Sequence, residues 1–210
     1  MNIGVDIDDT LTDTTTNLLD DFWLPIFKAE GLNFKIISNH NYYFLRYYGS
    51  KSKMDELWEK YYDKFNEIIP IKYNASRVIK LLREEGHKIF IVTARSQNSA
   101  EIRSKYWLKL RNVEYDGFAA FATNKVKDCK IFGITTFVDD APSNCMDLSN
   151  AGIKTFMMTH KTNLGLELNN VIRVKDWSEF YLRIKDLVKI EKIQNNENNK
   201  KIYKSYSQEL

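Results

Sequence analysis

The first strand of the chain and the acidic loop that follows it constrain the fold most. Ile3, Val5 and Ile7 alternate with small or polar residues, which is the period of a β-strand. Three carboxylates then crowd into residues 6–9, Asp-Ile-Asp-Asp. Two carboxylates about 4 Å apart repel by about 4 kcal/mol at an effective dielectric constant of about 20. Such a cluster therefore points either to a cation or proton that offsets the charge, or to a polar turn whose side chains cap backbone amides.

From Pro70 onward, strand-like and helix-like segments alternate. The continuous apolar run at 88–93 (Lys-Ile-Phe-Ile-Val-Thr) is typical of a strand buried on both faces. An amphipathic helix is predicted before it at 75–85, and a further helix after it at 98–110. This alternation predicts parallel β-α-β units, and therefore an α/β fold with a three-layer, doubly wound parallel sheet. Further strands are predicted at 118–122, 135–138, 153–158 and 171–174, and further helices at 125–132, 142–151 and 177–188.

The long segment after the acidic loop differs in composition and in the spacing of its apolar residues. Helical spacing of apolar residues predicts a helix over 17–30, interrupted at Pro25, and another over 54–65. Aromatic residues crowd the stretch between them, and the end of the chain is rich in Asn, Lys and Ser. The predicted domains are an α/β core at 1–13 and 70–190, a small α-helical cap at 14–69 inserted after the first strand, and a flexible polar tail at 191–210.

Charge and composition limit the expected partners. The net charge is only +3 and the basic residues are spread along the chain, which argues against a nucleic-acid polymer. No apolar run approaches the roughly 20 residues that span a bilayer, and no signal peptide is visible, so no membrane partner is expected. Cys129 and Cys145 have neither metal-site nor redox-pair spacing. We interpret them as reduced and buried, and expect a cytoplasmic protein.

Polar side chains at strand ends are the candidates for a functional site. In an open parallel sheet, ligands bind outside the carboxyl ends of the strands. If the predicted strands are neighbours, the polar groups at their ends converge on one crevice. These groups are Asp6, Asp8, Thr93, Lys125, Asp139 and Asp140.

The acidic residues in this set suit phosphoryl transfer. A carboxylate such as Asp6 can attack phosphorus and form an aspartyl-phosphate. Asp8, two residues further on, can protonate the leaving oxygen and later deprotonate the attacking water. Asp6 and one of Asp139 or Asp140, with the backbone carbonyl of Asp8, offer the oxygen ligands that Mg²⁺ prefers.

The remaining candidates can stabilise a phosphate. Thr93 and the backbone amides of Asp9 and Thr10 can donate hydrogen bonds to phosphate oxygens, and Lys125 can offset charge on the nucleophile and on the transferring group. Ala94 and Arg95 follow Thr93 and are candidate substrate contacts. In the cap, Tyr43 is a candidate for stacking on a base and Arg46 for contacting phosphate or base, while packing and surface ion pairs are the alternative roles for such residues.

On these residues the chain resembles the haloacid dehalogenase (HAD) superfamily of phosphohydrolases. The four motifs of that superfamily have counterparts in order at 6–10 (D-I-D-D-T), 91–95 (I-V-T-A-R), Lys125 and 137–140 (F-V-D-D). With the helical insertion, these motifs are similar to those of the 5'(3')-deoxyribonucleotidase group, including its bacterial members. Asp9 stands where many members have Gly, so the geometry of that loop is open.

The resemblance implies Asp6 as nucleophile, Asp8 as acid and base, and magnesium as cofactor. We therefore expect a magnesium-dependent phosphomonoesterase that acts through an aspartyl-phosphate, and specifically a 5'-nucleotidase on ribo- or deoxyribonucleoside monophosphates. One alternative is a phosphatase of another small phosphometabolite such as a sugar phosphate, and another is a non-catalytic phosphate-binding module. The expected partner is a small phosphorylated metabolite, and a homodimer stays an open alternative.

Overall fold

A six-stranded parallel sheet is the centre of the structure, which is a computed structural model. The structure describes residues 1–13, 24–31, 34–36, 45–47, 56, 60–61, 64, 68–95 and 100–206, with the backbone alone described at 24, 34–36, 45–47 and 195–206. The strand order is β5-β4-β1-β6-β7-β8, and all neighbouring strands are parallel. The strands are β1 (Asn2–Val5), β4 (Lys88–Val92), β5 (Gly117–Ala119), β6 (Thr136–Asp139), β7 (Lys154–Met158) and β8 (Val171–Val174).

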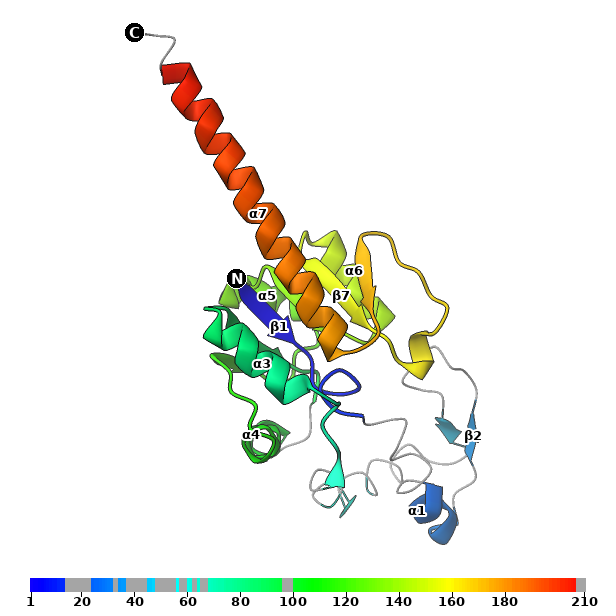
Figure 1. Cartoon of the computed structure of the whole chain (residues 1–210). Helices are drawn as coiled ribbons and strands as arrows, with labels where there is room; N and C mark the ends of the chain where they lie inside the picture. The colour runs from blue at the N-terminus through cyan, green and yellow to red at the C-terminus, as the bar shows by residue number, and fades with distance from the viewer. Residues whose placement is uncertain are drawn as a thin grey trace.

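Helices cover both faces of the sheet, which confirms the predicted three-layer α/β fold (Figure 1). On one face, α3 contacts α7, and residues of α4 belong to the same buried cluster. On the other face, α5 contacts α6, and both pack against strands of the sheet. These helices are α3 (Ala75–Glu84), α4 (Ala100–Leu110), α5 (Lys125–Phe132), α6 (Pro142–Asn150) and α7 (Trp177–Tyr206).

The apolar runs of the sequence form strands that are buried on both faces. Ile89 and Ile91 of β4 belong to the cluster under α3 and α7, whereas Phe90 belongs to the cluster under α5 and α6. On β1, Gly4 pairs in register with Phe137 of β6, and a Cβ atom at residue 4 would lie 2.2 Å from Cδ2 of that ring. A glycine at residue 4 therefore lets the fully buried ring lie directly over the first strand.

The described part of the inserted segment lies beyond the carboxyl ends of the strands (Figure 1). It contains the helix α1 (Leu24–Ala29) and an antiparallel pair formed by β2 (Phe34–Ile36) and β3 (Leu45–Tyr47). Residues 56, 60, 61 and 64, within the second predicted helix, are helical. The small α-helical cap that we predicted therefore also contains an antiparallel pair of strands, β2 and β3, which we did not predict. Their sequences, Phe-Lys-Ile and Leu-Arg-Tyr, alternate apolar and polar residues, which is a strand pattern too short to stand out among the aromatics.

The last helix is longer than its apolar pattern predicts. α7 runs for 30 residues to Tyr206 and projects away from the sheet (Figure 1). We predicted a flexible polar tail at 191–210; its backbone is helical up to Tyr206, which we did not predict, and its flexibility stays a prediction. Trp177, Phe180 and Ile184 are buried and anchor the first turns of α7. Adding residues such as Lys, Glu and Gln to an existing helix costs little, so the helix continues after its apolar face ends.

The domain boundaries stay predictions. Both cysteines are free and buried, as we interpreted them. Within the described residues, none of the helices combines the length and the apolar character that crossing a membrane requires.

Candidate active site

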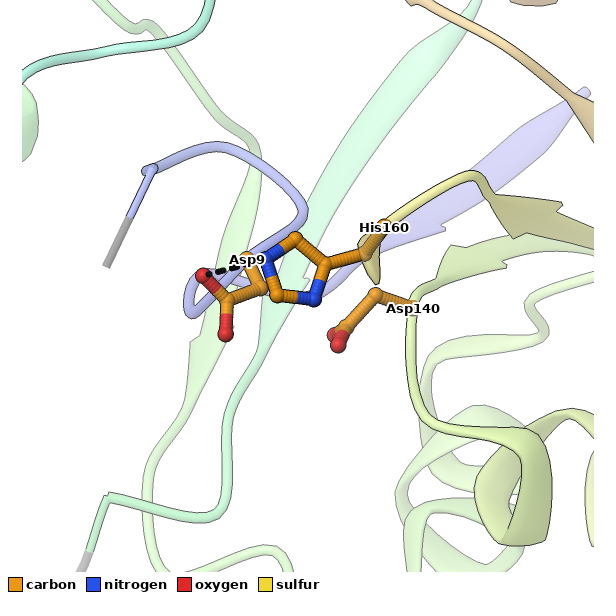
Figure 2. Close-up of side chains that lie close together, drawn as sticks. All are labelled: Asp9, Asp140 and His160. Atoms are coloured by element: carbon orange, nitrogen blue, oxygen red, sulfur yellow. Dashed lines mark ion pairs between the residues drawn. The ribbon is translucent and has the colours of Figure 1, made fainter. Parts of the chain in front are cut away.

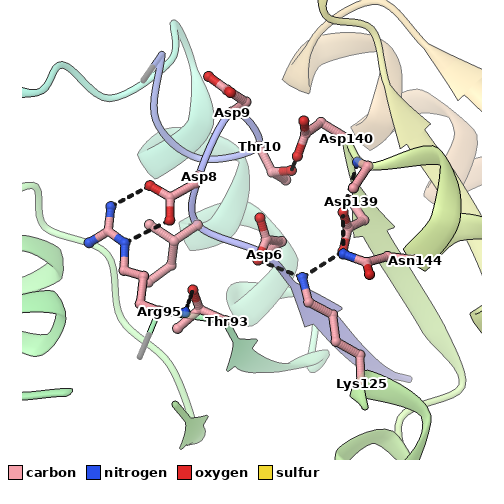
Figure 3. Close-up of polar contacts among 12 residues, drawn as sticks. Asp6, Asp8, Asp9, Thr10, Thr93, Arg95, Lys125, Asp139, Asp140 and Asn144 are labelled. Atoms are coloured by element: carbon pink, nitrogen blue, oxygen red, sulfur yellow. Dashed lines mark hydrogen bonds and ion pairs between the residues drawn. The ribbon is translucent and has the colours of Figure 1, made fainter. Parts of the chain in front are cut away.

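A buried ammonium group lies at the centre of the candidate site (Figure 3). Nζ of Lys125 donates to Oδ1 of Asp6 and to Oδ2 of Asp139, both at 2.6 Å. The side chains of Lys125, Asp6 and Asp139 are only 4%, 6% and 0% exposed. The three groups come from the ends of β1 and β6 and from the start of α5, so the predicted convergence of these residues at one edge of the sheet is observed.

Neighbouring strands bring these groups together. The backbone N–H of Asp6 donates to the carbonyl oxygen of Val138 at 3.1 Å, which continues the pairing of β1 with β6 past the end of β1. Asn124 caps the N-terminus of α5 by accepting from the backbone N–H of Lys127, and so fixes the point from which Lys125 extends. The side chain of Lys125 then reaches both carboxylates at once.

Asp139 has several further hydrogen bonds. Its Oδ1 accepts from the backbone N–H of Ala141 at 2.9 Å, and Nδ2 of Asn144 lies 3.2 Å from Oδ1 and 3.1 Å from Oδ2. Both carboxylate oxygens of Asp139 are therefore already bonded within the protein. The neighbouring Asp140 is also buried, and its Oδ1 accepts from the hydroxyl of Thr10 at 3.3 Å.

The loop after β1 turns tightly. The carbonyl oxygen of Ile7 accepts from the backbone N–H of Leu11 and of Thr12, each at 2.9 Å. Asp9 has φ +55°, in the left-handed region that Gly occupies at no steric cost and that Asp tolerates better than most residues. Its backbone N–H donates to Oγ1 of Thr12 at 3.2 Å, and that of Thr10 donates to Ile7 at 3.4 Å. The predicted hydrogen bonds from these two amides to phosphate stay a prediction.

Arg95 is buried against Asp8, an arrangement that we did not predict. Its Nε and Nη2 donate to Oδ2 and Oδ1 of Asp8 at 2.8 and 2.6 Å. From the sequence we expected this arginine to contact substrate, with a surface ion pair as the alternative, but its side chain is only 5% exposed. A contact of Arg95 with substrate stays a prediction.

His160 is a further residue that sequence reasoning missed. Its Nε2 lies 3.6 Å from Oδ1 of Asp9, and Figure 2 shows both side chains beside Asp140. Burial, with a smaller contribution from nearby Lys72 and Lys161, lowers the pKa of His160 to about 4, so its imidazole is neutral at pH 7. His160 lies two residues after the end of β7. The rule that selected the other strand-end residues would have selected it too.

The other predicted residues are placed as follows. Thr93 is buried directly after β4, and its Oγ1 accepts from the backbone N–H of Arg95 at 3.4 Å. Ala94 lies between them and is exposed. Tyr43 lies outside the described residues. Arg46 lies in β3, where only the backbone is described.

Burial and neighbouring charges oppose each other in this site. Burial raises the pKa of Asp6 to about 7, although the charge of Lys125 pulls it down, and Asp139 and Asp8 raise it further. Burial alone would lower the pKa of Lys125, but its attraction to Asp139 and Asp6 raises it above the usual value, so Lys125 is charged. One ammonium group does not balance the surrounding carboxylates, and the site favours a further positive charge.

The donor set fits a hard divalent cation. One carboxylate oxygen from each of Asp6, Asp139 and Asp140 lies within 4.8 Å of the others, and all three side chains are buried. Oxygen-only ligands of this kind suit Mg²⁺ and similar ions. Asp9, Asp140 and His160 satisfy the same distance criterion, so Asp140 belongs to both groups.

The chain resembles two proteins named as nucleotidases over most of its length. No protein-family model matches the chain. It is 25% identical over 184 residues to a nucleotidase of Clostridium acetobutylicum, covering 86% of this chain and 92% of that protein. It is 26% identical over 189 residues to a protein of Bacillus cereus named "Putative nucleotidase", covering 85% of this chain and 95% of that protein.

Solved structures with very different sequences share the fold. A HAD-superfamily hydrolase from Ehrlichia chaffeensis has a TM-score of 0.55 at 13% identity, covering 89% of this chain and 97% of its own. A predicted phosphoglycolate phosphatase from Haemophilus somnus has a TM-score of 0.63 at 15% identity, covering 88% of this chain and 97% of its own. The chain therefore has the fold of HAD-superfamily hydrolases and resembles nucleotidases in sequence.

The raised pKa of Asp6 predicts that Asp6→Asn stabilises the metal-free protein at alkaline pH. The pKa of Asp6 is about 7 in the folded protein and ordinarily 3.8, so between these pH values Asp6 takes up a proton when the chain folds. The contribution of Asp6 to the free energy of unfolding is therefore largest below pH 4 and is lost as the pH rises through 7. Asparagine resembles the neutral acid at every pH, so the variant avoids this loss.

Thermal unfolding in chelator at pH 5 and pH 8 measures the effect. We expect the Tm of Asp6→Asn to exceed that of the wild type by several degrees at pH 8, and the gap to narrow at pH 5. The exposed Asp186→Asn serves as the control and should leave Tm unchanged at both pH values. A lower Tm for Asp6→Asn at pH 8 would contradict the assigned pKa.

Proposed function

Because the chain has the fold of HAD-superfamily hydrolases, we propose that it is a magnesium-dependent phosphomonoesterase that forms an aspartyl-phosphate on Asp6. Its preferred substrates are nucleoside 5'-monophosphates, in ribo or deoxy form. The observation that carries the proposal is the buried Lys125 ammonium held between Asp6 and Asp139. It places a fixed positive charge beside a carboxylate at the carboxyl end of the central strand, where a phosphoryl group would transfer.

In the first step, the carboxylate of Asp6 attacks phosphorus. Lys125 holds Oδ1, and the other oxygen of Asp6 points toward the space between Asp8 and Asp140 (Figure 3), so we assign the attack to Oδ2. A bond forms from Oδ2 to phosphorus, the bond from phosphorus to the leaving oxygen breaks, and the proton of Asp8 goes to that oxygen.

In the second step, water hydrolyses the aspartyl-phosphate. Asp8, which lost its proton in the first step, takes one from the attacking water. The new bond forms between the water oxygen and phosphorus, the bond from phosphorus to Asp6 breaks, and inorganic phosphate leaves. Asp8 then carries a proton again and Asp6 is a free carboxylate, so the site is restored.

Asp6 and Asp140 are the side chains that we assign as ligands of the magnesium ion. When bound, the ion would supply positive charge that favours the ionised form of Asp6 and neutralises phosphate oxygens. Asp139 is the less suitable ligand, because its two oxygens already accept hydrogen bonds from Lys125, Asn144 and the backbone of Ala141. Its role is to hold Lys125 in place.

The substrate class rests on resemblance. The two relatives named as nucleotidases match this chain over most of its length, whereas the solved structures have 13–15% identity and support only the fold. The described part of the inserted segment lies beyond the strand ends (Figure 1), which supports a proposed role in covering the nucleoside. We expect it to close over the substrate and exclude bulk water, as lids do.

Asp6→Asn should abolish phosphatase activity. Asparagine is a far poorer nucleophile than a carboxylate, so hydrolysis of p-nitrophenyl phosphate with Mg²⁺ should fall by about 1,000-fold or more. Asp186→Asn makes the same chemical change on the exposed face of α7 and should retain activity. A chelator should abolish the activity of the wild type, and added Mg²⁺ should restore that activity. Turnover by Asp6→Asn close to that of the wild type would rule out Asp6 as the nucleophile.

A comparison of substrates decides the class. We expect kcat/KM for nucleoside 5'-monophosphates to exceed that for sugar phosphates by at least about 10-fold, a difference of about 1.4 kcal/mol in transition-state binding. A preference for sugar phosphates would reject the nucleotidase assignment and leave the mechanism intact.

Paired variants separate the two adjacent acids. Asp140→Asn should remove measurable Mg²⁺ binding in calorimetry, because it removes a ligand. Asp139→Asn should weaken binding by about 10–100-fold, as is usual for a residue that only supports the ligands. The opposite order of the two effects would make Asp139 the ligand.

A further inference from the structure

The paired hydrogen bonds between Arg95 and Asp8 point to a role for Arg95 in the reaction. Two parallel N–H groups of the guanidinium face the two oxygens of Asp8, at 2.8 and 2.6 Å (Figure 3). We propose that Arg95 is a positioning residue, which orients the carboxylate of Asp8 for proton transfer. This inference rests on the proposed function, because it assigns Asp8 as the acid and base.

Arg95 is the fixed partner of the pair. Its side chain is 5% exposed, whereas that of Asp8 is 24% exposed. Nη1 of Arg95 donates to Oγ of Ser104 on α4 at 3.2 Å, and its carbonyl oxygen accepts from the backbone N–H of Phe121 at 3.1 Å. The guanidinium of Arg95 is thus anchored to α4, and the backbone of Arg95 is anchored to the loop after β5. Two further N–H donors of the guanidinium hold the more exposed carboxylate of Asp8.

The paired geometry restrains Asp8 in a way that a single charge does not. A planar guanidinium that makes two parallel hydrogen bonds fixes both the position and the plane of a carboxylate. Asp8 lies in a tight turn next to Asp9, whose backbone is in the left-handed region. The turn fixes the backbone of Asp8, but it does not fix the two torsion angles of the Asp8 side chain. A displacement of about 1 Å in a catalytic group lowers the rate by about 100-fold. Holding Asp8 in place with two hydrogen bonds should therefore raise the rate of proton transfer.

The same geometry predicts which steps depend on Arg95. Asp8 moves a proton in both steps: it protonates the leaving oxygen in the first and takes a proton from water in the second. In the first step, that proton matters only when the leaving oxygen departs poorly without it. When Asp8 carries the proton for the leaving oxygen, one of the two hydrogen bonds must open while the other still holds the side chain. Loss of Arg95 should therefore slow reactions in proportion to their need for an acid or a base.

Two phosphate esters that differ in leaving group test this inference. p-Nitrophenolate leaves readily without a proton, whereas the alkoxide of a simple alkyl phosphate does not. In Arg95→Gln, we expect kcat/KM to fall by about 100-fold for the alkyl ester and by less than about 10-fold for the aryl ester. Because the second step also needs Asp8, the aryl ester should give a burst of p-nitrophenol in the variant.

A double-mutant cycle shows whether Arg95 acts through Asp8. Asp8→Asn alone should give the same selective loss on the alkyl ester. Adding Arg95→Gln to Asp8→Asn should then cost little more, because the group that Arg95 positions is already gone. Additive losses would overturn the inference. Ser104→Ala removes one anchor and keeps the fork, so it should change both esters by less than about 10-fold.

Arg95→Lys guards against a folding defect, because it keeps the buried charge and loses only the fork. Thermal unfolding identifies the variants that fold, and Arg95→Lys should show the same selective loss on the alkyl ester. Equal losses on both esters, or a higher KM for both with kcat unchanged, would overturn the inference and assign Arg95 to structure or to phosphate binding. If wild-type protein with Mg²⁺ hydrolyses neither ester, the proposed function itself fails.

Discussion

The candidate site depends on the buried ion pairs of one ammonium group, that of Lys125. Carboxylate oxygens of Asp6, Asp139 and Asp140 lie close enough together to bind one ion, and burial removes the water that would solvate their charges. Buried charges of one sign persist only when opposite charges or protons accompany them. Lys125 offsets only part of the charge of these three carboxylates, and the pKa of Asp6 stays raised, chiefly by burial and further by the charges of Asp139 and Asp8. This imbalance favours both a divalent cation and the positive environment that phosphoryl transfer needs.

The sheet supplies this arrangement because β1 lies between β4 and β6. Asp6 and Asp139 then come from neighbouring strand ends, and the loop after β4 brings Arg95 to the opposite side of Asp6, against Asp8 (Figure 3). The close approach of β1 and β6 requires a residue without a side chain at Gly4, opposite the ring of Phe137. Packing in the core and charge in the site are thus linked through the same two strands.

Periodicity in the sequence predicted the sheet and the meeting of Asp6, Lys125 and Asp139, because both follow from local patterns and from the rule that ligands bind at strand ends. It did not predict the pairing of Arg95 with Asp8 or of His160 with Asp9. Such pairs depend on how separate loops fold against each other, which no local period reports. The β2–β3 pair and the end of α7 were missed because short strands and polar helices have weak apolar patterns.

Trapping the phosphorylated enzyme tests the central claim most directly. Protein mixed with Mg²⁺ and an aryl phosphate is quenched during turnover and treated with borohydride, which reduces an acyl phosphate to an alcohol and so converts the aspartate to homoserine. Peptide mass spectrometry then locates the modified residue. The account predicts homoserine at position 6, and only when substrate is present. Release of phosphate with unmodified Asp6, or with homoserine at another position, would contradict it.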